Sequence, residues 1–194
     1  MSNGRSVTKE NKLNAILDAA TEILVNKPTA SMNDIADYAG IGIATLHRYV
    51  ESREQLFVQL ALRAITVVGE ILDQIPTNDE HIEAYIPTVV EELIPYGDKI
   101  HFLIQDNQLY CNEEILKAEA KILEPLREVI ETLQQRGSIR QDMSSEWILH
   151  VLYTLLILTW GQVQTGHVAK RSAAKLVIDT LFHGVKANAA ASSR

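Results

Sequence analysis

The glycines of Gly40-Ile41-Gly42 give this sequence its closest approach to a phosphate-binding loop. A dinucleotide-binding loop has the pattern G-x-G-x-x-G between a strand and a helix, because glycine lets the backbone approach the pyrophosphate. Here Thr45 replaces the third glycine, and the preceding stretch NDIADYA has the periodicity of a helix. These departures argue against nucleotide chemistry, so the glycines need another explanation.

Other residue types that perform catalysis or bind metals show no suitable spacing. The six histidines form no H-x-x-x-H or H-E-x-x-H pair, and no G-x-S-x-G motif occurs. Cys111 is the only cysteine, so one chain can form neither a disulfide nor a cysteine-ligated zinc site. We therefore expect no enzymatic activity, no metal site and no cofactor, and we interpret the thiol as structural in a reducing cytoplasm.

The elements that position these residues are predicted to be helices. Only 9 glycines and 5 prolines occur in 194 residues, and no segment shows the alternation of a strand. Apolar residues at helical spacing divide the chain into about nine segments, which predicts an all-α fold. We expect no signal peptide, because no apolar run follows the polar start, and no membrane span, because the apolar run 147–160 is too short.

The two glycines are better explained as parts of a helix-turn-helix. Apolar residues fall at helical spacing in residues 31–39 and again in residues 43–50, with Gly40 between the two segments. Gly40 can adopt the left-handed conformation that ends a helix, and a tight glycine-containing turn joins the helices of this motif. Leu46 and Val50, four positions apart, are then expected to face the core.

The outer face of the second short helix carries candidate contact residues. Gly42 is expected to begin this helix and to bring its backbone close to a partner. An arginine on this face can reach a guanine edge or a phosphate, and threonine and histidine can hydrogen-bond phosphates or bases. The outward-facing residues are Ala44, Thr45, His47 and Arg48.

The stretch SMNDIADYAGIGIATLHRYVESREQL, residues 31–56, resembles the helix-turn-helix of the tetracycline-repressor (TetR) family of bacterial transcription regulators. The family pattern is roughly T-x-x-x-I-A-x-x-A-G-V-S-x-G-T-L-Y-x-Y-F-x-S-K-E-x-L, and the turn, the Thr-Leu step and the Ser-Arg-Glu helix start recur in register. The resemblance implies phosphate contacts from Ser31 and from Arg53, which stands where the family has lysine. It also implies DNA contacts from Thr45 and His47.

Several residues of the contact surface depart from the family pattern. His47 replaces a tyrosine, so its phosphate contact is expected to be weaker or pH-dependent, and Gly42 replaces a serine. Ile43 and Ala44 offer almost no hydrogen-bonding groups, so base recognition is expected from the remaining polar side chains and from contacts with thymine methyl groups. The predicted DNA-binding residues are Ser31, Gly42, Ile43, Ala44, Thr45, His47, Arg48 and Arg53.

The resemblance also implies two helical domains. We place an N-terminal three-helix DNA-binding domain at residues 1–52, with a disordered arm of about residues 1–8. A ligand-binding and dimerisation domain is expected over residues 53–188, followed by a tail at residues 189–194. The charge distribution agrees with different partners for the two parts. The first 63 residues carry 7 basic and 7 acidic side chains, and the remainder carries the whole net charge of −7.

The C-terminal domain is expected to form the homodimer through its last two helices. In the family these helices pair with their copies as a four-helix bundle, and here they correspond to residues 145–166 and 170–187. The acidic surplus disfavours an anionic ligand, so a neutral or cationic lipophilic effector is expected. Pocket candidates combine an apolar body with a polar tip. They are Tyr85, His101, Gln105, Tyr110, Trp147 and Tyr153.

The function predicted from these features is that of a TetR-like, cytoplasmic bacterial transcription regulator. We expect a repressor that a small molecule releases from a palindromic, double-stranded DNA operator. A ligand-independent regulator or an activator is the alternative within this class. A small helical enzyme or a helical adaptor is the alternative from another class, and each leaves the helix-turn-helix unexplained.

Overall fold

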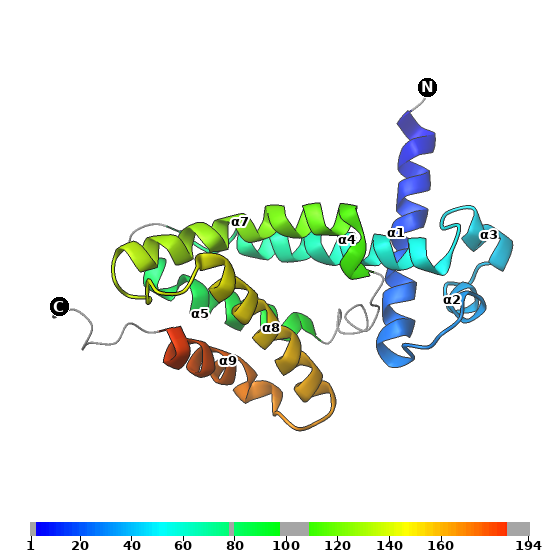
Figure 1. The fold of residues 1–194 in the computed structure, drawn as a ribbon. Coiled ribbons are helices and arrows are strands. Elements are labelled where there is room, and N and C mark those ends of the chain that lie inside the picture. The colour runs from blue at the N-terminus through cyan, green and yellow to red at the C-terminus, as the bar shows by residue number, and fades with distance from the viewer. Residues whose placement is uncertain (1–2, 78–79, 98–108, 186–194) are drawn as a thin grey trace. The chain divides into compact units, whose positions relative to one another are not determined.

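The computed structural model of the protein describes residues 3–77, 80–97 and 109–185. Within these ranges the chain forms eight α-helices and two 3-10 helices and no β-strand (Figure 1), which confirms the predicted all-α fold. The chain divides into two compact units. The first comprises Met1–Ile65 and Lys99–Lys117, and the second comprises Thr66–Asp98 and Ala118–Arg194.

The first unit contains the helices α1 (Asn3–Asn26), α2 (Met32–Tyr38) and α3 (Ile43–His47), together with the N-terminal part of α4 (Arg53–Leu72) and the 3-10 helix η3 (Leu109–Cys111). Each of these helices contributes one apolar face to a common core. The core includes Ile16, Leu17, Ala20, Leu24, Ile35, Ala36, Leu46, Val50, Leu56, Phe57, Leu60, Leu109 and Ile115.

The N-terminus and the domain boundary differ from the sequence-based expectations. Helix α1 already begins at Asn3, so residues 3–8, expected to be a disordered arm, are helical. No proline interrupts this stretch, and its helix continues without a break into the face that begins near Leu13. The first unit extends to Ile65, beyond the boundary expected at residue 52, because the first half of α4 packs into its core.

The second unit contains α5 (Ile82–Leu93), η1 (Ile94–Tyr96), most of α7 (Glu113–Gln135), α8 (Ser145–Gln164) and α9 (Lys170–Val185). Helices α8 and α9 lie side by side and are joined by a short turn (Figure 1). Helices α4 and α7 also approach closely, since a Cβ at Gly69 would lie 3.1 Å from Ile122. The core of this unit includes Tyr85, Ile86, Val89, Val90, Leu126, Ile130, Leu133, Leu149, Leu152, Val177 and Leu181.

Two prolines lie inside continuous helices, although a proline within a helical pattern predicts a kink or a break in the helix. Pro87 lies within α5, which runs unbroken from Ile82 to Leu93. Pro125 lies within α7, where we had expected an interruption. A proline inside a helix removes one backbone hydrogen bond. For Pro125 the orphaned carbonyl belongs to Lys121, an exposed residue, so the break costs little and the amphipathic packing of α7 prevails.

Helix α4 is the one helix of the described ranges that is long and apolar enough to cross a membrane by length and composition. Our sequence reading considered only the run 147–160 for this role. The N-terminal half of α4 supplies Leu56, Phe57, Leu60 and Ala61 to the core of the first unit. These apolar residues are therefore covered by protein, which accounts for the hydropathy of this half of the helix.

Candidate nucleic-acid interface

The turn between α2 and α3 is a Schellman motif built around Gly40. The Gly40 amide donates to the Asp37 carbonyl at 3.1 Å, and the Ile41 amide donates to the Ala36 carbonyl at 3.0 Å. Gly40 has a φ of 66°, in the left-handed region that favours glycine, which confirms its predicted role. Ile41 packs against the core beside α2 and α3. The turn is thus fixed by its own backbone hydrogen bonds and by the packing of the Ile41 side chain.

Helix α3 buries one side and exposes the other. Leu46 and Val50 are fully buried, as predicted, and Gly42 is the N-cap of the helix with an extended backbone. On the other side, Ile43 is an exposed large apolar residue, and Thr45 is half-buried. The remaining predicted contact residues of this surface are also exposed: Gly42, Ala44, His47 and Arg48. Every predicted contact on α3 therefore lies on or beside its outer face.

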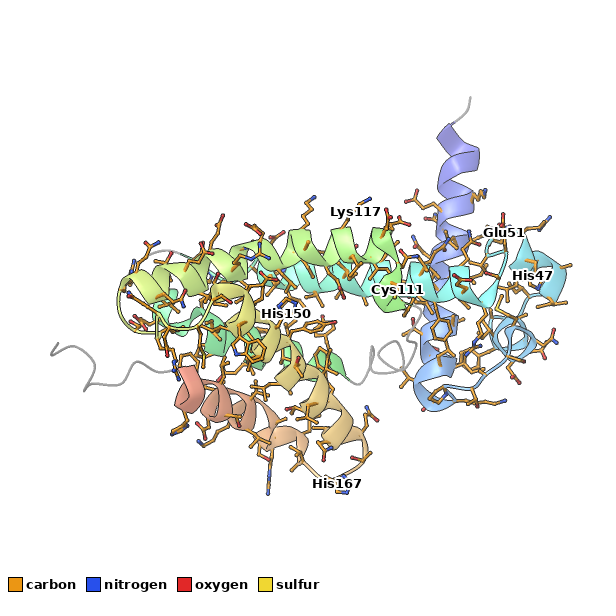
Figure 2. All side chains as sticks on the ribbon, viewed as in Figure 1. His47, Glu51, Cys111, Lys117, His150 and His167 are labelled. Carbon is orange, nitrogen blue, oxygen red and sulfur yellow. The ribbon has the colours of Figure 1, made fainter. Side chains whose placement is uncertain are left out.

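His47 is held by the backbone that follows α3. Its Nδ1 lies 3.2 Å from the carbonyl oxygen of Glu51, and Figure 2 labels both residues at this end of the first unit. Because a carbonyl only accepts hydrogen bonds, this contact requires a proton on Nδ1. The Nε2 atom of the neutral ring is then an acceptor, and it becomes a donor only when the imidazole is protonated. This constraint separates His47 from the tyrosine of the family pattern, whose hydroxyl can donate.

Ser31 caps α2 in a reciprocal capping box. The Asp34 amide donates to Ser31 Oγ at 3.2 Å, and the Ser31 amide donates to Asp34 Oδ2 at 2.7 Å. Ser31 Oγ also donates to the same carboxylate, and Lys27 Nζ lies 3.1 Å from Asp34 Oδ1. The backbone and hydroxyl bonds from Ser31, followed by the contact with Lys27, lower the pKa of Asp34 to about 2. The network fixes the start of α2, where the predicted phosphate contact lies.

The Arg53 guanidinium turns back onto the loop between α1 and α2. It donates to the carbonyl of Ala30 and, at 3.1 Å, to the carbonyl of Pro28. It also lies over the ring of Phe57, with its carbon 4.7 Å from the ring centroid. The family resemblance predicts a phosphate contact for Arg53 but not these bonds, because nothing in the spacing links residue 53 to residues 28 and 30. Two of its five N–H groups are used within the chain.

The start of α4 is held by two hydrogen bonds of Gln55. The Gln55 amide donates to Ser52 Oγ at 3.1 Å, as in one half of a capping box. The Gln55 side chain accepts from the Glu51 amide at 2.6 Å, one residue before the N-cap. Together these bonds fix the segment that joins α3 to α4, and with it the carbonyl that holds His47.

The predicted pocket residues of the second unit are not all brought together. Tyr85 is fully buried in α5, where burial and then the charge of Asp73 raise the pKa of its hydroxyl. The half-buried Tyr153 donates to Glu119 Oε1 at 3.3 Å. Trp147 lies on the surface of α8, with 59% of its area exposed. Two other candidates, His101 and Gln105, and the side chain of Tyr110 lie outside the described residues.

Two polar groups of this unit were missed by sequence reasoning. Glu119 of α7 is half-buried, and its burial raises the pKa of its carboxyl group. Trp160 of α8 is 8% exposed, and its indole nitrogen is buried without a hydrogen-bond partner. No spacing pattern marks either residue, since a glutamate on an amphipathic helix is usually solvated and a tryptophan in an apolar helix is usually core. Within the described ranges, no group of three or more potential metal ligands occurs.

The comparisons with known proteins agree with this geometry. Residues 16–60 match the family described as "Bacterial regulatory proteins, tetR family". The chain is 28% identical over 166 residues to the HTH-type transcriptional repressor LfrR of Mycolicibacterium smegmatis, a match covering 86% of this chain and 82% of LfrR. It is 24% identical over 173 residues to the HTH-type transcriptional regulator NfxB of Pseudomonas aeruginosa, covering 87% of this chain and 91% of NfxB.

The fold is shared with solved structures of the same kind. The crystal structure of LfrR in complex with proflavine matches with a TM-score of 0.76 and 23% identity, over 93% of this chain and 99% of that one. A TetR family transcription regulator from Marinobacter aquaeolei matches with a TM-score of 0.74 and 17% identity, over 94% of this chain and 100% of that one. At these identities the structural matches establish the architecture of both units.

Proposed function

The chain belongs to the tetR family of bacterial regulatory proteins, and we propose that it acts as a dimeric repressor that a small molecule releases from a palindromic DNA operator. The family consists of DNA-binding regulators without enzymatic activity. The observation that carries the proposal is the construction of α3. Its inner side is anchored by buried Leu46 and, just beyond its C-terminal end, by buried Val50, and its outer side presents an exposed surface that begins at the N-cap Gly42.

This outer surface of α3 fits the major groove of DNA. Ile43 and Ala44 offer apolar contacts to thymine methyl groups, and Arg48 can bind a guanine edge. Thr45 and His47 serve as hydrogen-bonding groups, and the acceptor Nε2 of a neutral His47 suits a base amino group. When protonated, the same ring can donate to a phosphate.

Phosphate contacts outside α3 are proposed for Ser31 and Arg53. The hydroxyl of Ser31 lies at the exposed start of α2 and is positioned by the capping box with Asp34. Arg53 retains N–H donors beyond those bound to the carbonyls of Pro28 and Ala30, so it can hold the loop and a phosphate together. Such contacts release counterions and give affinity despite the neutral charge of the first 63 residues.

Dimerisation is proposed through the outer faces of α8 and α9, which expose large apolar side chains. Trp147 and Leu158 lie eleven residues apart on one side of α8 and are 59% and 55% exposed, and Leu176 of α9 is 47% exposed. A second copy of the chain would cover these residues. Their exposure also favours an interface role for Trp147 over the pocket role predicted from its chemistry. A dimer presents two copies of α3 to two half-sites, which explains the palindromic operator.

The ligand response is proposed to pass through α4, which continues from the first unit into the second. Within the first unit, Arg63 of α4 donates to the Asn14 carbonyl at 3.2 Å and pairs with Asp18 at 2.5 Å, so α4 and α1 are tied together. A ligand that binds one position of α4 more tightly shifts the population of conformations that match the operator. LfrR has been solved with proflavine, which makes a lipophilic cation a reasonable first effector to test.

We place this regulator in the bacterial cytoplasm. The proposal is tested by measuring whether the protein binds DNA sequence-specifically. Genomic footprinting with the wild-type protein should identify a palindromic site, and gel-shift titration should give its affinity. A Thr45→Ala/His47→Ala variant should bind this site about a hundredfold more weakly, because each good base or phosphate contact contributes about 1–3 kcal/mol. Unchanged circular dichroism would show that the variant is folded. Absence of palindromic binding by the wild type would overturn the proposal.

A further inference from the structure

Glu119 of α7 is a carboxylate placed partly inside the second unit, and no ion pair with a cation is found for it among the described residues. Its one hydrogen bond among the described residues comes from the Tyr153 hydroxyl of α8, at 3.3 Å. Four other carboxylates of this unit are paired: Glu124 and Glu146 with Arg127, Asp142 with Arg140, and Asp179 with Lys175. Carboxylates removed from water are normally paired with a cation, so Glu119 lacks a partner that its environment calls for.

The lysines nearest to Glu119 in the sequence cannot supply that cation from α7. Lys117 and Lys121 lie two residues before and after it, and residues two apart on a helix do not face each other. Lys117, labelled on α7 in Figure 2, pairs with Glu113 at 3.2 Å instead. Lys121 is exposed. The two lysines of α7 that flank Glu119 therefore do not pair with it.

Trp160 provides a second polar group of this unit that has no partner. Its indole N–H is a donor only, and among the described residues nothing accepts from it. The ring cannot easily turn toward water, because it packs directly on the backbone of Gly97. A Cβ at that position would lie 1.9 Å from Cδ1 of the ring. The donor is thus locked in the interior, and buried unsatisfied donors are rare enough to need an explanation.

Tyr153, which bonds Glu119, and Trp160 lie on one side of α8. They are seven residues apart, so they lie on the same face, separated by two turns or about 10.5 Å. Leu156 and Ile157 lie between them and are buried and half-buried. This stripe has an acceptor for a cation at one end, a hydrogen-bond donor at the other, and an apolar surface between them. Its length matches a system of about three fused aromatic rings.

We propose that Glu119 and the Trp160 indole are the polar anchors of the effector site, and that the effector is a planar aromatic cation bearing a hydrogen-bond acceptor. Glu119, oriented by Tyr153, binds a positively charged N–H group of the ligand. The Trp160 N–H donates to the ligand's acceptor, and Leu156 and Ile157 contact the ring system. This assignment rests on the proposed function, since it specifies the effector that releases the repressor.

The test uses thionine and proflavine, two dyes of the same three-ring outline with amino groups at both ends. Thionine has an unprotonated ring nitrogen that can accept a hydrogen bond, whereas the ring nitrogen of proflavine is protonated at neutral pH. Equilibrium binding to the full-length protein is followed by dye absorbance or fluorescence. Glu119→Gln should weaken both dyes about tenfold or more, because it keeps the Tyr153 hydrogen bond and removes the charge. Trp160→Phe should weaken thionine but leave proflavine nearly unchanged.

Glu128→Gln, at an exposed position of α7, is the matched control and should leave both affinities at the wild-type value. Acridine at pH 8, which has the same three-ring frame but no charge, should bind wild type and Glu119→Gln equally. If Glu119→Gln binds both dyes like the wild type, or loses acridine to the same extent, the proposed role of Glu119 is wrong. If Trp160→Phe affects the two dyes equally, the donor role of Trp160 is wrong.

Gel shifts run in parallel separate this inference from the proposed function. Suppose that thionine releases the wild-type protein from its operator and releases the Glu119→Gln variant equally well. The proposed role of Glu119 is then wrong, whereas the proposed repressor function is supported. If the wild-type protein binds thionine through Glu119 but binds no operator, the proposed repressor function is wrong and the proposed ligand site is supported. Unchanged thermal unfolding of Glu119→Gln without dye would show that lost binding is not lost folding.

Discussion

In the first unit, three polar side chains of the proposed DNA surface are hydrogen-bonded within the chain, whereas in the second unit the two proposed polar anchors of the effector site have no charged partner and no acceptor, respectively, among the described residues. Ser31 bonds with Asp34, His47 with the Glu51 carbonyl, and Arg53 with two loop carbonyls. Glu119 has one neutral donor, and the Trp160 N–H has no acceptor among the described residues.

The difference follows from where each surface meets its ligand. The DNA surface is in contact with water, so spare donors there are satisfied by solvent, and internal bonds serve to hold the remaining groups in position. An interior site has no water to rely on, and groups meant for a ligand must be left unpaired by the protein at some cost in stability. Among the described residues, the first unit also contains one buried polar group without a hydrogen-bond partner, the side-chain oxygen of Gln59 in α4.

The largest expected effect is a loss of operator binding when the outer faces of α8 and α9 are changed. These faces of the second unit expose large apolar residues, whereas the DNA surface of the first unit also exposes polar ones. A Leu158→Glu substitution should separate the dimer and weaken operator binding about a hundredfold or more, because a monomer reads only one half-site. Light scattering should then give a single species of 21.7 kDa. Gln135→Glu adds the same charge at an exposed position of α7 and should leave the dimer intact. A dimeric Leu158→Glu protein would place the interface elsewhere.

A smaller effect, on the free energy of unfolding, is expected when Gly40 or Gly42 is replaced. The two substitutions test whether the turn at Gly40 holds the DNA surface of the first unit in place. Gly40→Ala should lower the free energy of unfolding by about 1–2 kcal/mol, because the left-handed conformation is strained for any side chain. Gly42→Ala should leave the free energy of unfolding near the wild-type value, since its φ is −71° and a Cβ there meets no atom within 4 Å. Urea denaturation measures both values. Equal losses at the two positions would contradict the assignment of the turn to Gly40.

The smallest effects are expected in the pH dependence of stability, where a carboxylate from each unit should act with opposite sign. The pKa of Asp34 is lowered from 3.8 to about 2, so its ionised form stabilises the folded state above about pH 4, and this contribution is lost as pH falls through 2. Burial raises the pKa of Glu119 above 4.5, so ionisation of Glu119 reduces stability as pH rises past that value.

Denaturation of Asp34→Asn and Glu119→Gln across pH 2 to 7 separates the two contributions. Relative to the wild type, Asp34→Asn should be less stable at neutral pH, with the difference disappearing toward pH 2. Glu119→Gln should be equally or more stable at neutral pH, with the difference disappearing on acidification. If both substitutions lowered, or both raised, the free energy of unfolding at neutral pH, the two carboxylates would not act on stability with opposite sign.

The sequence was sufficient to predict the features that depend on local pattern. The helical fold, the left-handed Gly40 and the buried pair Leu46 and Val50 were predicted, because periodicity and glycine placement act over a few residues. The family was predicted from the resemblance of residues 31–56 to its pattern, and residues 16–60 match the family model. The bonds of Arg53 to the loop at residues 28 and 30 were not predicted, because they join residues more than 20 positions apart. The pairing of Glu119 with Tyr153 was missed for the same reason.

The expectation of a break at Pro125, and of a kink or a break at Pro87, has a different origin. A proline weakens a helix locally by removing one hydrogen bond, and a local reading therefore predicts a break. The apolar faces on both sides of each proline are buried in the same core, and this tertiary packing outweighs the lost bond. Local rules describe such positions poorly because the deciding contacts come from other helices.

The construction of α3 has a consequence for how this protein can evolve. Its shape depends on the turn at Gly40 and on two buried side chains, whereas Ile43, Ala44 and Arg48 lie on its exposed side. Mutations at these three positions are therefore nearly free of selection for folding. A duplicated gene can drift through them toward a new binding sequence while the rest of the protein keeps its effector.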